Sequence, residues 1–134
     1  MFRSNWFVEL LQRGVQITIL VNSPSLSSKV KVPSYYLDLL CQFPNCTVRY
    51  FPGHFIHTKM FIVDRKVVSD VSFNMSYKSL YKDYENLFTT NNPELVKSFF
   101  ECFDAFVKRS TPYKPIWFPK VLSWVYNLVV QCLV

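Results

Sequence analysis

The residues best suited to chemistry lie in one short stretch of the chain, at His57 and Lys59. On an extended strand, alternate side chains point to the same face, so an imidazole and an ammonium group two residues apart lie together. An imidazole can attack phosphorus and form a covalent intermediate. An ammonium group can stabilise the charge that develops on the non-bridging oxygens. The pair therefore predicts cleavage of a phosphodiester.

Further polar residues follow in an order that fits the same chemistry. Ser72 and Asn74, again two residues apart, can add neutral hydrogen-bond donors from a neighbouring segment. Glu85 can hold the second nitrogen of the imidazole and set its tautomer. An isolated histidine in an apolar strand is more often structural, but this ordered set from His57 to Glu85 favours a functional site.

The spacing of these residues resembles a known family. Residues 57–64 (HTKMFIVD) are similar to the His-x-Lys-x(4)-Asp signature of the phospholipase D superfamily, and residues 71–74 (VSFN) stand where the family has Gly-Ser-x-Asn. The small one-motif members, bacterial endonucleases and mitochondrial cardiolipin hydrolases, resemble the chain at three further segments: 13–20 (RGVQITIL), 83–86 (DYEN) and 91–95 (NNPEL).

The resemblance implies one active site built from two such motifs at a twofold axis, with no metal and no other cofactor. It gives His57, Lys59 and Asp64 as the catalytic set, with one His57 attacking phosphorus and a second protonating the leaving oxygen and then activating water. Lys59, Ser72 and Asn74 would hold the phosphate, and Asp64 would have a structural role, fixing the backbone next to it. Because this chain carries one motif, the expected partner is a second copy in a homodimer.

Charge leaves the substrate open between phospholipid and nucleic acid. Fifteen Lys and Arg residues against nine Asp and Glu give a net charge of +6, which favours polyanionic partners. Four cysteines with no paired spacing, and only two histidines, argue against a Cys/His metal site.

The alternative to a phosphodiesterase is a degenerate, non-catalytic member of the family that binds a membrane or a partner. Val71 at the family's glycine position, the acid Asp70 beside it and the shortened N-terminus favour that alternative.

Hydrophobic periodicity predicts the elements that position these residues. We expect a helix from Asn5 that ends at Gly14, where glycine suits a C-terminal cap. A helix should begin at Asn92, a capping residue followed by proline, with an apolar stripe in the core. The predicted strands are 15–21, 48–51, 57–63, 66–70 and 86–90, a short helix covers 34–43, and the stripe consists of Leu95, Val96, Phe99, Phe100, Phe103 and Phe106.

These elements predict an α/β fold, with a mixed sheet flanked by helices, in a single domain. We expect residues 1–112 to form a phospholipase-D-like catalytic half-domain that is shortened at its N-terminus and lacks the family's usual first strands. Without them, the predicted strand 15–21 has an unpaired apolar edge, which is an association hazard.

Residues 113–134 form a basic and then hydrophobic tail. Residues 121–134 carry no charge, and Trp117 and Trp124 suit a membrane interface. We interpret the tail as an interfacial helix or weak anchor, with residues 108–134 facing an anionic membrane, which favours association with a cytoplasmic membrane face. The alternatives are a helix that packs on the domain or a partner, and a transmembrane span.

Overall fold

The computed structural model describes residues 5–22, 34–53, 55–73, 78 and 81–115. Its helices are α1 (Asn5–Gln12), α2 (Ser34–Leu40) and α4 (Pro93–Arg109), and its strands are β1 (Ile17–Asn22), β2 (Cys46–Phe51), β3 (Met60–Val63), β4 (Val67–Val71), β5 (Leu87–Thr90) and β6 (Thr111–Pro112).

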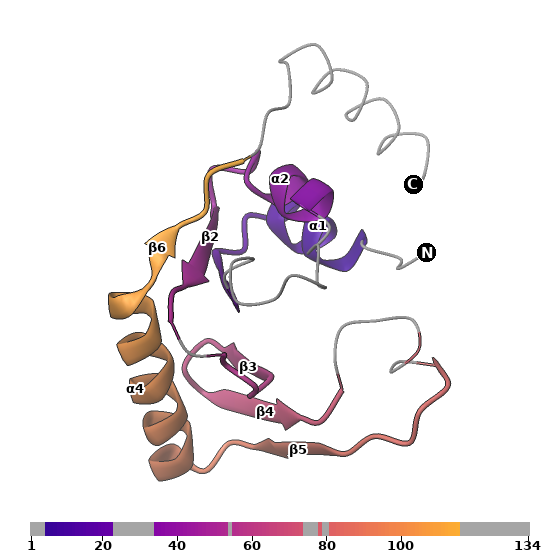
Figure 1. Cartoon of the computed structure of the whole chain (residues 1–134). Coiled ribbons are helices and arrows are strands. Elements are labelled where there is room, and N and C mark those ends of the chain that lie inside the picture. Colours follow the sequence, from indigo (N-terminus) through magenta and orange to yellow (C-terminus); the bar gives the residue numbers. More distant parts are fainter. Residues whose placement is uncertain (1–4, 23–33, 54, 74–77, 79–80, 116–134) are drawn as a thin grey trace.

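The strands lie between two layers of helix. Two three-stranded sheets are formed, sheet A with the order β1-β2-β6 and sheet B with the order β3-β4-β5. Helices α1 and α2 lie on one side of the strands, and α4 runs along the other from β6 to β5 (Figure 1). The predicted α/β class with flanking helices is confirmed, although the single expected sheet is divided into two.

Sheet A is built around a helix–strand step. Helix α1 ends before Gly14, whose φ of +83° suits glycine and turns the chain into β1, as the sequence predicted. Strand β1 pairs in parallel with β2, from Ile17 opposite Cys46 to Asn22 opposite Phe51. As predicted, β1 pairs on one edge alone within the described chain.

The core of sheet A lies between these strands and the helices α1 and α2. Val8 and Leu11 of α1 and Leu40 of α2 are buried together, and Leu37 packs with Val48 and Tyr113 in a second cluster. The short strand β6, which the sequence did not predict, brings Tyr113 there by pairing antiparallel with β2. Tyr113 therefore belongs to the core of sheet A.

A buried acid closes this core. Asp38 on α2 is 2% exposed and accepts a hydrogen bond from the hydroxyl of Tyr113. Burial, together with Asp38, raises the pKa of Tyr113 far above its ordinary value. An acid is costly to bury without a hydrogen-bond partner, so the hydroxyl of Tyr113 stabilises the buried Asp38. The same contact joins α2 to a residue near the end of the described chain.

Helix α4 begins as predicted but buries less than predicted. The side chain of Asn92 accepts hydrogen bonds from the amides of Glu94 and Leu95, and Pro93 follows it. Of the predicted core stripe, Val96 is buried, Leu95 is 43% exposed, and the four phenylalanines are partly buried. Helix α4 packs across both sheets, against β2 of sheet A and against β3 and β4 of sheet B.

No helix in the described ranges is long and apolar enough to cross a membrane. The predicted membrane-binding tail lies almost wholly outside those ranges, because the described chain ends at residue 115.

Removing the hydroxyl of Tyr113 should destabilise the fold. In Tyr113→Phe the buried Asp38 loses this donor, so we expect the free energy of unfolding to fall by about 1–3 kcal/mol. Urea denaturation measures the change. The matched control is Tyr84→Phe, because Tyr84 is fully exposed and its substitution should change stability by less than about 0.5 kcal/mol. Equal stability of the two variants would contradict a stabilising role for this contact.

Candidate active site

His57 and Lys59 lie together immediately before β3. The predicted strand 57–63 begins only at Met60, so both residues belong to the segment that leads into it. The Nζ atom of Lys59 is 3.4 Å from Nε2 of His57. An ammonium group can only donate, so this contact is a hydrogen bond when Nε2 is the ring nitrogen that carries no proton. His57 is exposed and Lys59 is half-buried, which leaves the pair open to a ligand.

Asn22, the last residue of β1, holds the backbone next to His57. Its side-chain amide donates to the carbonyl of Ile56 at 2.8 Å and accepts from the amide of Ile56 at 2.7 Å. This two-point contact fixes the residue that precedes the imidazole. Sequence analysis missed this role, and the available signal was a polar residue that closes an apolar strand.

Ser72 and Glu85 meet at the junction of β4 and β5. The hydroxyl of Ser72 donates to Oε2 of Glu85 at 2.5 Å and accepts from the amide of Asn86 at 2.9 Å. Glu85 was predicted to orient His57, but within the described ranges its hydrogen bond goes to Ser72 and none joins it to the imidazole. Asn74, the other predicted phosphate ligand, lies outside those ranges.

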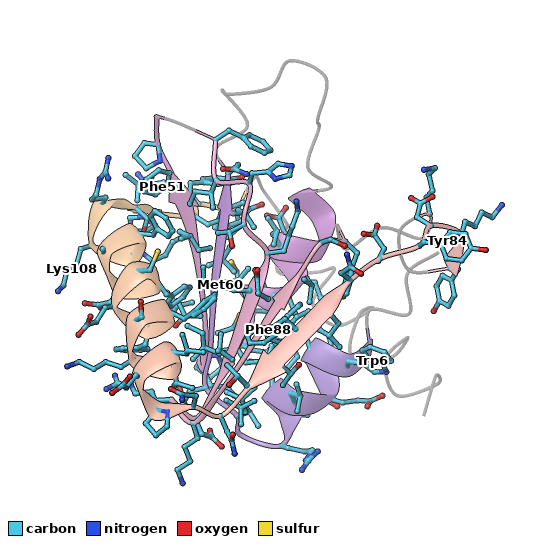
Figure 2. All side chains as sticks on the ribbon, turned by 90° about the horizontal axis from the view of Figure 1, so that it is seen from below. Trp6, Phe51, Met60, Tyr84, Phe88 and Lys108 are labelled. Atoms are coloured by element: carbon cyan, nitrogen blue, oxygen red, sulfur yellow. The ribbon has the colours of Figure 1, made fainter. Side chains whose placement is uncertain are left out.

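The loop that delivers Glu85 is held by an ion pair of its own. Lys78 contacts both carboxylate oxygens of Asp83, at 2.8 and 2.9 Å. The hydrogen bond to Asp83 raises the pKa of Lys78, so this lysine stays protonated at neutral pH. Tyr84, beside it, projects outward from the strands (Figure 2).

Val71, at the family's glycine position, fits without distortion. It is buried in β4, and its amide donates to the carbonyl of Lys59 at 2.9 Å. Among the described non-glycine residues, only Asp64 and Arg65 have positive φ, so position 71 does not require glycine. The valine packs as an ordinary strand residue.

Asp70 lies on the other face of sheet B from Lys59. It pairs with Met60, and residues directly opposite each other in an antiparallel pair share a face. Since side chains alternate, Lys59 points to the opposite face. The carboxylate instead accepts a hydrogen bond from Thr58 at 3.4 Å. The acid is therefore directed away from the ammonium group.

Asp64 occupies the turn at the far end of the β3–β4 hairpin. Asp64 and Arg65 have φ of 52° and 56°, and the amide of Lys66 donates to the carbonyl of Val63 at 2.9 Å. Val63 pairs with Val67, so the hairpin loop has three residues, 64–66, and the positive φ of its first two residues is that of a type I′ turn, in which aspartate is favoured. Five residues of extended chain put Asp64 about 17 Å from Lys59, so within one chain it does not reach the same phosphate.

An open pocket of about 410 Å³ also lies at this turn. Arg65, Lys66 and Asn91 line it with the start of α4. It is separated from His57 by the length of β3, so it is not part of the His57–Lys59 site.

Comparison with known proteins gives the family. The model of the family described as cardiolipin synthase, PLD-like domain, matches residues 4–107. The chain belongs to this family. The matched range contains the positions of His57, Lys59, Asp64, Ser72 and Glu85.

Two solved structures have a similar fold. Nuc from Salmonella typhimurium, a phospholipase D family member, superposes with a TM-score of 0.69 at 22% identity, over 81% of this chain and 72% of that one. NucT from Helicobacter pylori gives a TM-score of 0.63 at 20% identity, over 78% of this chain and 69% of the NucT chain. No curated protein matches the chain. The PLD-like fold is thus established, and family membership supports a phosphodiesterase-type function.

Loss of the Asn22 contact should loosen the backbone beside His57. In Asn22→Leu both hydrogen bonds to Ile56 are lost, so we expect the amide of Ile56 to exchange with solvent on the order of tenfold faster. Hydrogen exchange measured by NMR reports this position directly. Asn45→Leu is the control, because Asn45 also makes two backbone hydrogen bonds, to Leu11 and Val15 at the other end of β1. Equal acceleration at Ile56 in both variants would count against a local role for Asn22.

Proposed function

We propose that the protein is a metal-independent phosphodiesterase that works through a phosphohistidine on His57. The observation that carries the proposal is the 3.4 Å approach of Lys59 Nζ to His57 Nε2. The lone pair of the nucleophile and the cation converge on one point at an exposed position. A phosphate oxygen that takes over the hydrogen bond from Lys59 leaves Nε2 facing phosphorus.

The reaction then runs in two displacements. Nε2 of His57 forms a bond to phosphorus while the bond from phosphorus to the leaving oxygen breaks, and that oxygen takes a proton from a second imidazolium. The second imidazole, now neutral, removes a proton from water, and the water oxygen displaces His57 from phosphorus. Lys59 neutralises the charge on the non-bridging oxygens in both steps.

The second imidazole is the partner subunit's His57. The matched motif supplies one histidine, and the only other histidine of the chain is His54. A homodimer with twofold symmetry brings two identical His57–Lys59 pairs together at a single site. The substrate is a phosphodiester of phospholipid or nucleic acid, in keeping with the net charge of +6.

The structure weakens two of the three observations that favoured a non-catalytic role. Val71 packs as a regular strand residue, and Asp70 points to the face opposite Lys59. Position 71 does not need glycine, and the acid at position 70 is directed away from Lys59, which supports the phosphodiesterase over the non-catalytic role.

Removal of the nucleophile should abolish hydrolysis of bis-p-nitrophenyl phosphate in EDTA. We expect His57→Ala to lower kcat by about 10,000-fold or more, because the covalent route is lost. Lys59→Ala should lower kcat by about 100–1,000-fold through loss of charge stabilisation. Lys66→Ala is the matched control, since Lys66 is exposed at the hairpin turn. Turnover retained by a folded His57→Ala protein would exclude the proposal.

Mixed dimers test whether two chains share one site. When equal amounts of wild-type and His57→Ala chains are unfolded together and refolded, random pairing makes about a quarter of the dimers fully wild-type. If each site needs both histidines, activity falls to about a quarter of that of the same amount of wild-type dimer. Activity of one half would mean that each chain works alone.

A further inference from the structure

An exposed phenyl ring lies beside the proposed nucleophile. Phe55 is 59% exposed, and the centroid of its ring is 6.2 Å from that of the His57 imidazole. The two ring planes are inclined at 40°, so the imidazole is not stacked on the phenyl ring and leaves its face uncovered. Phe55 and Lys59 therefore both neighbour His57, two residues before it and two residues after it.

The backbone that carries this ring is held in place. Ile56, between Phe55 and His57, exchanges two hydrogen bonds with the side chain of Asn22, at 2.8 and 2.7 Å. An aromatic side chain has only two rotatable bonds, so a contact made on it costs little conformational entropy when its backbone is already fixed. The phenyl ring is thus a preorganised apolar surface.

The place of Phe55 matters more than its exposure, because single exposed apolar side chains are common on protein surfaces. Both Phe55 and His57 are exposed, and their rings are 6.2 Å apart. A substrate whose phosphorus reaches Nε2 of His57 therefore brings the group bonded to that phosphate close to the phenyl ring. A segment of the chain that covered the ring would also obstruct the nucleophile.

The chemistry of the neighbouring group distinguishes the two candidate substrates. In a phospholipid, the groups bonded to the phosphate are glycerol and a polar head group, and the acyl chains begin beyond the ester carbonyls. In a nucleic acid, the sugar bonded to the phosphate carries a planar base, and in single strands the face of a base stacks on aromatic side chains. A phenyl ring beside the nucleophile matches the base better than it matches the polar groups of a lipid.

We propose that Phe55 stacks on the base next to the scissile phosphate and thereby selects single-stranded nucleic acid as the substrate. The inference rests on the proposed phosphodiesterase at His57 and names its substrate class. Lys59 holds the charged phosphate, Phe55 holds the uncharged base, and the net charge of +6 suits the same polyanion. Every base has a face that can stack, so the selection is for nucleic acid and not for a base sequence.

Two substrates that differ only in the base test the proposal on the full chain. Both are p-nitrophenyl phosphodiesters, one of thymidine and one of the corresponding abasic sugar, so the leaving group contributes equally to both. We expect Phe55→Ala to lower kcat/KM for the thymidine ester by about 5–100-fold and for the abasic ester by less than about twofold. Phe55→Trp keeps an aromatic face and should retain the preference for thymidine.

Phe88→Ala is the matched control. Phe88 of β5, marked in Figure 2, is 54% exposed, close to the value for Phe55. It pairs with Asp70, which points away from Lys59, so its ring lies on the opposite face of sheet B. This variant should change neither kcat/KM value by more than about twofold.

Three outcomes would overturn the proposal. Equal losses on the two esters in Phe55→Ala would mean that the ring positions His57 and does not contact a base. A larger loss on a short-chain phosphatidylglycerol than on the thymidine ester would assign the ring to a lipid. A preference for thymidine that appears only after deletion of residues 116–134 would assign the exposed ring to those residues of the chain itself.

Binding separates this inference from the proposed reaction. Fluorescence anisotropy gives the Kd of a labelled oligothymidylate of about five nucleotides, and of its abasic counterpart, without any need for turnover. A preference for the thymidine strand that is lost in Phe55→Ala, in a protein that hydrolyses neither ester, would support the base contact and reject the reaction. No preference for the base in either measurement would overturn the inference, and hydrolysis of both esters would then still support the reaction.

Discussion

The pairing of β3 with β4 decides the face of the sheet on which each side chain of the site lies. The turn that begins at Asp64 and Arg65 fixes this register, and a slip of one residue would move every side chain to the opposite face. In the observed register Lys59 and Asp70 point apart, and the carbonyl of Lys59 is held by the amide of Val71. Asp64 thus has a structural task in the turn, at the end of β3 away from Lys59.

Contacts from sheet A complete the positioning of His57. Asn22 of sheet A holds the backbone of Ile56 by two hydrogen bonds. The imidazole of His57 therefore lies between this contact and the β3–β4 hairpin of sheet B. Ser72, which follows β4 at the same end of the hairpin as Lys59, joins Glu85 and the backbone of Asn86. The site is therefore assembled from both sheets, and its geometry depends on how firmly those sheets are held together.

Much of this arrangement was predictable because the signals are local. The cap at Asn92 and the glycine after α1 each depend on a few neighbouring residues, and each appears as expected. The partners of Glu85 and Asn22 were not predictable, because they are set by contacts between segments distant in sequence. Strand β6 was missed for the same reason, since two residues carry no periodicity. The phenylalanines of α4 were over-interpreted, because helical spacing shows a shared face but not how much of it is covered.

The contact between Asp38 and Tyr113 has a consequence for the way the chain is made. The two residues are 75 positions apart, so a ribosome that adds about 5–20 residues per second synthesises the donor roughly 4–15 seconds after the acid. During that interval α2 carries a carboxylate without its buried partner, and β2 lacks its short outer neighbour β6. Sheet A therefore completes its core only after sheet B and α4 have been synthesised. The first half of the chain cannot reach its final packing until the second half has been made.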